Sequence, residues 1–239
     1  MKNNPFFSVI ICCYNSEKYI DETLNSIINQ TFKDWEIVIV DDGSTDKTVS
    51  IINNYINKGI RINYFFQKNK GLASARNKAV ELAESDWIVI IDHDDICMLN
   101  RLETQYSDIV NNPDVKLFFS NSYHIDENGK VLNEQFKIID PTNENLSKQN
   151  AMNSLLKKGC YIDSETVVFN KNAAIDIGLF NENYKFILDY DFFLKMGNNY
   201  NLYCNQNILS KWRVHNEQAT NKIYLINLDE HLQIYLRNM

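Results

Sequence analysis

The chain has 239 residues, of which 44% are hydrophobic and 23% charged, a composition typical of a globular protein with a sizeable core. Seven Gly and three Pro exclude collagen-like and Pro-rich disordered chains. The formal net charge of −7, without any basic stretch, disfavours a nucleic-acid partner.

The longest apolar stretches are Phe6–Cys13 and Trp87–Ile91, and both are far shorter than the roughly 20 residues that cross a bilayer. No signal-peptide pattern is present, because Asp21 and Glu22 follow the first stretch without a small-residue cleavage site. We therefore expect a cytoplasmic protein, at most attached peripherally to the inner face of the cell membrane. The five cysteines lack CxxC and Cys/His spacing, which disfavours a disulfide framework and a zinc site.

The first half of the chain alternates short apolar stretches, which predict buried strands, with stretches whose apolar residues recur at helical spacing. The expected strands are Ser8–Cys13, Trp35–Val40, Arg61–Gln67, Trp87–Ile91 and Val115–Phe119. The expected helices are Ile20–Ile28, Thr45–Asn57, Leu72–Ala83 and Leu99–Val110. This pattern predicts an α/β fold with a Rossmann-like, mostly parallel sheet and helices on both of its faces.

The alternation ends in the second half of the chain. Asp126–Gly129 predicts a hairpin turn between strands at Asn121–Ile125 and Lys130–Leu132. Further strands are expected at Thr166–Phe169 and Ile208–Val214, helices at Asn150–Lys157, Asp189–Gly197 and Ile223–Leu236, and a polar loop at Phe136–Lys148. Because no linker or repeat interrupts the chain, we expect one domain over residues 1–239.

Polar residues follow each of the first four expected strands at its carboxyl end, where open α/β sheets bind ligands. Tyr14 and Asn15 follow the first strand, Asp41–Ser44 the second, Lys68–Gly71 the third and Asp92–Asp95 the fourth. These carboxyl ends meet at one edge of a parallel sheet. The sequence therefore predicts one ligand site that combines several carboxylates with cationic side chains.

Asp92, Asp94 and Asp95 place three carboxylates within four residues after an apolar stretch. Like charges this close are costly unless a cation neutralises them. Oxygen donors suit Mg²⁺ or Mn²⁺, with substrate phosphates completing the coordination shell. The alternative is an acidic turn that caps a helix, but three carboxylates together favour the metal–phosphate site.

Asp42 has two interpretations. Gly43 permits a turn and Ser44 can cap the next helix, so that the segment is structural. Alternatively, the Asp42 carboxylate binds a base or a ribose, as an acid after a Rossmann strand does. The GxGxxG signature is absent, which disfavours a dinucleotide redox cofactor.

Lys70 and Arg76 lie at the start of the expected helix Leu72–Ala83. Free N–H groups and the helix dipole favour an anion at such a position, and the two cations would add charge. The alternative is a solvated cationic face.

Taken in order, these segments resemble the family 2 glycosyltransferases, which have the GT-A fold. The matching segments are Ser8–Asn15, Asp41–Ser44, Lys70–Asn77, Asp92–Asp95, Ile177–Glu182, Asp189–Lys195 and Trp212–His215. The resemblance implies an inverting, non-processive, metal-dependent enzyme of bacterial type. It would move one sugar from a nucleotide diphosphate sugar, first of all a UDP-sugar, to an acceptor hydroxyl in surface glycan synthesis. Residues 1–120 would bind the donor, and residues 121–239 the acceptor and the catalytic base.

The resemblance also implies roles for individual residues. Asp42 would contact the nucleotide base, and Asp189 would be the catalytic base, with Asp191 as its competitor. The donor would further be bound by Tyr14, Asn15, Lys70, Arg76, Asp92 and Arg213, with Arg213 and His215 closing over the diphosphate. Mn²⁺ or Mg²⁺ would be held by Asp92, Asp94, Asp95 and His215. The acceptor would be a glycan, a lipid-linked sugar or a glycoprotein, and we expect Asn121–Tyr123, His124 and Tyr161–Thr166 to line its half of the site.

The chain departs from the family pattern in three places. Cys12 stands where Pro is usual, Leu188 replaces the Glu that precedes the base, and Leu179 replaces a Gly. The Gln-x-x-Arg-Trp element of processive members is also missing, which disfavours a polymerising synthase. Leu188 keeps a second hypothesis open, a catalytically silent module that binds nucleotide sugars.

Two further alternatives follow from single segments. A sugar nucleotidyltransferase is disfavoured because Cys12–Asn15 occupies the place of its Gly-rich loop. Outside the resemblance, Asp189 would be a carboxylate at a helix N-terminus and His215 a surface or packing histidine.

Overall fold

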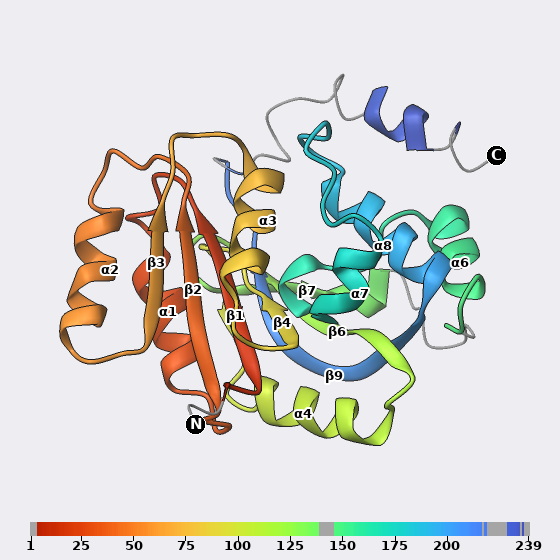
Figure 1. Cartoon of the computed structure of the whole chain (residues 1–239), viewed down its shortest axis with the longest axis horizontal. Helices are drawn as coiled ribbons and strands as arrows, with labels where there is room; N and C mark the ends of the chain where they lie inside the picture. The colour runs from red at the N-terminus through yellow and green to blue at the C-terminus, as the bar shows by residue number, and fades with distance from the viewer. Residues whose placement is uncertain (1–3, 139–145, 217, 219–228, 235, 237–239) are drawn as a thin grey trace.

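The computed structural model describes residues 4–138, 146–216, 218, 229–234 and 236 (Figure 1). In chain order the elements are β1 (Phe7–Cys13), α1 (Ile20–Ile28), β2 (Trp35–Asp41), α2 (Thr48–Asn57), β3 (Ile62–Phe66), α3 (Leu72–Leu82), β4 (Trp87–Ile90), β5 (Ile96–Cys97), α4 (Arg101–Asn111), β6 (Val115–Ile125), β7 (Val131–Glu134), α5 (Gln135–Ile138), α6 (Asn150–Lys158), the 3₁₀ helix η1 (Ser164–Thr166), β8 (Val168–Asn170), α7 (Lys171–Asp176), α8 (Leu188–Asn199) and β9 (Asn201–Arg213). Across these ranges the strands form one sheet in the order β3-β2-β1-β4-β8-β6-β9-β5, with β7 paired to β6.

The first four strands of the alternating pattern pair with one another in parallel. β1 lies between β2 and β4, and β3 pairs with β2, all in parallel. Both faces of β1 are buried, with Val9 and Ile11 in the core under α1 and α2, and Ile10 and Cys12 in the core under α3. Burial on both faces explains why the strand is a continuous apolar stretch, and it confirms the predicted α/β fold.

The second half of the chain extends the sheet with mixed pairing. β8 is antiparallel to both β4 and β6, whereas β6 and β9 run in parallel over most of their length. The fifth strand of the sequence pattern is therefore not the neighbour of β4, because β8 lies between them. The expected strands Val115–Phe119 and Asn121–Ile125 are one strand, β6, whose register against β9 shifts at Ser120–Ser122. The hairpin between β6 and β7 is confirmed.

Several boundaries differ from the prediction. α2 begins at Thr48 instead of Thr45, because Asp46 accepts hydrogen bonds from the Thr48 N–H and hydroxyl and holds the preceding residues in a loop. α4 begins at Arg101, and Leu99 is exposed. The sequence patterns missed β5 and α7, which are only two and six residues long.

Two expected elements lie partly outside the described residues. Of the polar loop Phe136–Lys148, residues up to Ile138 belong to the helix α5 and residues 139–145 are not described. Of the terminal helix Ile223–Leu236, residues 229–234 and 236 are helical and the others are not described. No helix within the described ranges combines the length and the apolar composition that crossing a bilayer requires.

Candidate functional site

The carboxyl ends of β1, β2 and β4 open into a cavity of about 1460 Å³, which the turn before β8, the start of α8 and the residues after β9 complete. Eight of the predicted site residues line it, namely Tyr14, Asn15, Asp42, Arg76, Asp92, Asp94, Asp189 and His215. Four others, Lys70, Asp95, Asp191 and Arg213, do not. The cavity thus opens at the strand ends where ligands of open α/β sheets bind, and the binding roles of these residues stay predictions.

Asp42 is buried in the cavity wall and organises the loop that leads into α3. One of its oxygens accepts hydrogen bonds from the Lys70 N–H at 2.8 Å and the Gln67 Nε2 at 2.7 Å, and the other accepts from the Gly71 N–H at 2.8 Å. Gly43 packs against this loop so closely that a Cβ atom there would lie 3.0 Å from the Asn69 nitrogen. Lys70 thus contributes its backbone to this arrangement, and its side chain is exposed.

Arg76 connects the acidic turn after β4 with the start of α8. Its side chain is 1% exposed, its Nη2 lies 2.8 Å from Asp92 Oδ1, and its Nη1 donates to Asp189 Oδ1. Burial opposes the positive charge, but the Asp189 and Asp92 carboxylates outweigh it and raise the pKa of Arg76. Burial raises the pKa of Asp189, and Arg76 acts in the opposite direction. A permanent cation therefore lies between two cavity carboxylates.

The two candidates for the catalytic base occupy different surroundings. Asp189 lines the cavity in the first turn of α8. Asp191 is 0% exposed and forms an ion pair with Lys195 Nζ at 3.2 Å. Leu188, at the position of the usual Glu, is buried in the core. Of the two carboxylates, Asp189 faces the space that a substrate would occupy.

The three neighbouring carboxylates Asp92, Asp94 and Asp95 have three different partners. Asp92 binds Arg76, and Asp94 Oδ2 lies 2.8 Å from Nε2 of His215. Although Asp94 is buried, His93 and His215 lower its pKa. Asp95 turns away and accepts a hydrogen bond from the Arg213 N–H, and burial together with the charges of Asp94 and Glu165 raises its pKa well above the ordinary value.

Of the four predicted metal ligands, Asp92 and Asp95 are engaged with Arg76 and Arg213, whereas Asp94 and His215 contact each other. In the part of the chain that the structure describes, no group of three or more His, Cys, Asp and Glu side chains is placed to hold a metal ion. Asp94 and His215 are the predicted ligands that meet at the cavity wall. Cations that bind nucleotide phosphates use one or two side chains and complete their shell with phosphate oxygens and water. The pair Asp94–His215 fits such a cation.

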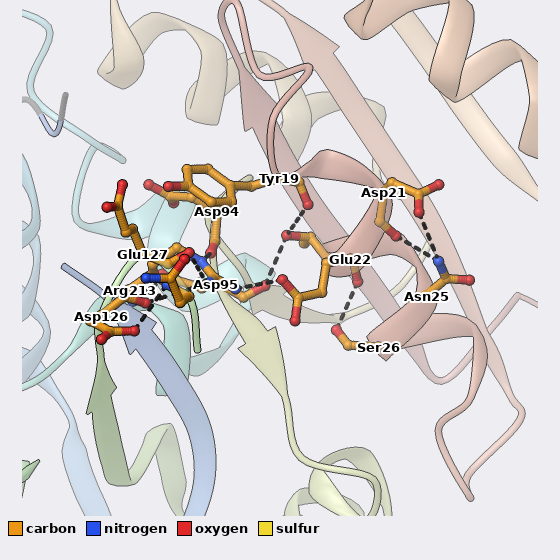
Figure 2. A network of polar contacts seen from close by, with 12 residues as sticks. Tyr19, Asp21, Glu22, Asn25, Ser26, Asp94, Asp95, Asp126, Glu127 and Arg213 are labelled. Atoms are coloured by element: carbon orange, nitrogen blue, oxygen red, sulfur yellow. Dashed lines mark hydrogen bonds and ion pairs between the residues drawn. The ribbon is translucent and has the colours of Figure 1, made fainter. Parts of the chain in front are cut away.

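The Arg213 side chain binds three segments, namely the acidic turn after β4, helix α1 and the turn between β6 and β7 (Figure 2). It is 2% exposed, its Nε donates to the Asp94 carbonyl at 2.9 Å, and its Nη2 lies 2.6 Å from Glu22 Oε2 in α1. Its Nη1 donates to carbonyls of the Asp126–Glu127 turn, and its guanidinium lies 4.7 Å from the Tyr19 ring centre. This arrangement differs from the expectation that Arg213 closes over the diphosphate. The role of Glu22 gave no signal in the sequence, because 191 residues separate it from Arg213.

The turn before β8 supplies part of the cavity wall. Ile162–Glu165 line the cavity as expected, whereas Asn121–His124 lie behind them. Asp163 Oδ2 accepts a hydrogen bond from Ser122 Oγ at 2.6 Å and lies 3.1 Å from His124 Nε2. Ser164 Oγ donates to Asp92 Oδ2 at 3.2 Å, which joins this wall to the acidic turn. Tyr161 is fully buried and does not line the cavity.

Comparisons with known proteins show the family of the chain. Residues 8–178 match the family model described as Glycosyl transferase family 2, so the chain belongs to that family. An uncharacterised glycosyltransferase of Methanocaldococcus jannaschii is 37% identical over 207 residues, which are 81% of this chain and 71% of that protein. Another from Rickettsia typhi is 33% identical over 232 residues, which are 92% of this chain and 69% of that protein.

Solved structures show the same fold. Residues 1–349 of TarS from S. aureus, in complex with UDP-GlcNAc, superpose with a TM-score of 0.74 at 25% identity. The superposition covers 92% of this chain and 61% of the TarS chain, so this chain spans less than two thirds of that structure.

Proposed function

We propose that the protein is an inverting, non-processive glycosyltransferase that moves one sugar from a nucleotide diphosphate sugar to an acceptor hydroxyl. The observation that carries this proposal is the position of Asp189 at the cavity wall, held by Arg76, which also holds Asp92. The UDP-GlcNAc complex of TarS makes a UDP-sugar the first donor to test.

The nucleoside and the diphosphate of the donor would bind in different parts of the cavity. Asp42 and the loop that it organises would receive the nucleoside, beside Tyr14 and Asn15. Asp94 and His215 would hold Mn²⁺ or Mg²⁺, which supplies positive charge to the diphosphate as it leaves. Arg76 adds a fixed cation between Asp92 and Asp189, in a buried place where charge is poorly screened.

The chemical step would need one base. The acceptor oxygen attacks the anomeric carbon from the face opposite the leaving group, and the Asp189 carboxylate takes the hydroxyl proton. The bond from the anomeric carbon to the diphosphate oxygen breaks, and its electron pair leaves with the nucleoside diphosphate. No covalent enzyme intermediate forms, so no Ser or Cys nucleophile is required. The position of Asp189 also speaks against a catalytically silent module.

The acceptor would bind beside the turn that contains Asp163. We extend the proposal to a glycan, lipid-linked or glycoprotein acceptor in the synthesis of bacterial surface glycans, on the strength of the family resemblance. The carboxylate of Asp163, fixed by Ser122 and His124, is a suitable acceptor for sugar hydroxyl hydrogen bonds.

A thermal-shift panel tests the donor proposal. UDP, GDP, CDP, dTDP and ADP are each added with and without Mn²⁺, and a ligand at 100 times its dissociation constant should stabilise the fold by about 2.7 kcal/mol. We expect a Mn²⁺-dependent shift that is largest for UDP and is lost in Asp94→Ala. The absence of any shift with all five nucleotides would contradict the proposed function.

A further inference from the structure

A glutamate near the C-terminus binds the backbone that leads into α8. Glu230 belongs to the helical residues 229–234, drawn in blue near the C label of Figure 1, and its side chain is buried. Its Oε1 accepts a hydrogen bond from the Lys185 N–H at 2.9 Å. Its Oε2 accepts from the Phe186 N–H at 3.1 Å and from the Ile187 N–H at 3.2 Å. One carboxylate therefore binds three successive backbone donors.

The segment Lys185–Ile187 leads into α8 without a cap from its own N-cap residue. Ile187 is the N-cap residue of α8, and its apolar side chain makes no capping hydrogen bond. Asp189, an acidic residue in the first turn, binds Arg76 across the cavity. The hydrogen bonds that fix the entry to α8 thus come from a residue at least 43 positions further along the chain.

Apolar packing holds the helical residues 229–234 in the same place. Ile234 is fully buried and belongs to the hydrophobic core that also contains Ile187 and Tyr190. The His231 ring lies 5.8 Å from the Tyr190 ring, measured between centres. The contact of Glu230 is therefore part of a packed interface and is not an isolated surface bond.

This interface borders the cavity. Lys185, Phe186 and Ile187 line it, and so does His231 from the C-terminal residues. Asp189 follows Ile187 by two residues, so any movement of the Lys185–Ile187 backbone displaces the proposed base relative to Arg76. Hydrogen bonds to an ionised carboxylate are stronger than neutral ones, which suits Glu230 to fix this backbone.

We propose that Glu230 is a positioning residue, which holds the Lys185–Ile187 wall of the cavity and thereby sets the place of Asp189. Its effect on catalysis rests on the proposed function, whereas its effect on the order of the cavity wall does not. Glu230 touches no reacting atom, and it acts only through the backbone that it binds.

The test compares Glu230→Ala and Glu230→Gln with wild type and with Leu232→Ala, an exposed residue of the same segment. In Glu230→Ala, the amide hydrogens of residues 185–187 should exchange at least about tenfold faster, while those of β1 keep their rates. The kcat should fall about 10- to 100-fold, whereas the UDP dissociation constant stays within about twofold. Glu230→Gln keeps one acceptor oxygen, so its exchange rates and kcat should lie between those of wild type and Glu230→Ala. Leu232→Ala should match wild type in both.

Two results would overturn the proposal. One is unchanged exchange of residues 185–187 in Glu230→Ala. The other is faster exchange with an unchanged kcat, assayed well below the melting temperature of each variant, which would leave Glu230 a merely structural contact. If the wild-type chain transfers no sugar, the proposed function fails by itself. The exchange rates of residues 185–187 then decide whether Glu230 orders this wall.

Discussion

Arg76 in α3 donates a hydrogen bond to Asp189 at the start of α8, although 113 residues separate the two in the chain. The same buried guanidinium binds Asp92 in the turn after β4. One cation thereby fixes the distance between the acidic turn, where a diphosphate would lie, and the proposed base. The contact also couples the ionisation of Asp189 to the charge of Arg76.

The first prediction concerns the dependence of activity on pH. Burial raises the pKa of Asp189, and Arg76 partly opposes this. A base must be ionised, so kcat/KM should fall as the pH drops through that raised pKa, above the range of an ordinary Asp. Arg76→Gln removes the opposing charge and should move the acid limb upward by about one pH unit or more, whereas Arg76→Lys should move it less. An acid limb that stays in place in Arg76→Gln would contradict this coupling.

The second prediction concerns the metal ion. In the presence of UDP, His215→Ala and Asp94→Asn should each weaken Mn²⁺ binding by about tenfold or more, measured by calorimetry. Asp95→Asn is the matched control, because Asp95 binds the Arg213 N–H away from the cavity. If Asp95→Asn weakened Mn²⁺ binding as much as Asp94→Asn does, Asp95 would be a metal ligand, and this prediction would be wrong.

The third prediction separates a structural role of Arg213 from contact with the diphosphate. Arg213→Ala leaves three carbonyls and Glu22 without their partner, and should lower the free energy of unfolding by about 2–3 kcal/mol. This value lies below that of a broken, fully buried pair, because Glu22 is half exposed and solvent screens it. Urea unfolding measures it.

Lys18→Ala is the control for Arg213→Ala. Lys18 forms an exposed ion pair with Glu127, in the hairpin turn that Arg213 also contacts, so its loss should leave the urea midpoint unchanged. If Arg213→Ala unfolds at the same urea concentration as wild type and only its UDP affinity falls, this prediction is wrong and Arg213 contacts the diphosphate.

The fourth prediction concerns the cavity wall at Asp163. Asp163→Ala should lower kcat/KM for sugar transfer about tenfold or more, through the loss of a charge-assisted hydrogen bond, and leave the UDP dissociation constant unchanged. Tyr161→Phe is the control, because Tyr161 is buried outside the cavity lining and its hydroxyl donates to Ser154 Oγ at 3.2 Å. Unchanged kcat/KM in Asp163→Ala would remove this wall from the sugar-binding part of the site.

Except for the two-residue strand β5, the first half of the fold could be predicted from the sequence, because its longer strands and helices each show their own apolar pattern. The place of β8 could not, since it depends on antiparallel pairing between Ile88 and Phe169, which are far apart in the chain. The extent of β6 was also missed, because the polar residues Ser120–Ser122, where the register against β9 shifts, interrupt the apolar stretch in the sequence.

The strand ends predicted where a cavity opens, but not which side chains face it. Asp42, Asp92 and Asp94 line that cavity, since the ends of parallel strands share one edge of the sheet, and their roles stay predictions. Which of two adjacent carboxylates faces the cavity depends on distant partners. Arg213 turns Asp95 away from the cavity, and the buried position of Asp191 beside Lys195 keeps it off the wall. Such partners leave no local pattern in the sequence.

The central claim is that Asp189 is the base of a nucleotide-sugar transfer, and one variant tests it most directly. UDP affinity by calorimetry and UDP release from a UDP-sugar are measured on the same preparation of Asp189→Asn. We predict a turnover reduced by about 10²- to 10⁴-fold and a UDP dissociation constant within about twofold of wild type. Undiminished turnover, or an equal loss of turnover and UDP binding, would contradict the assignment of Asp189.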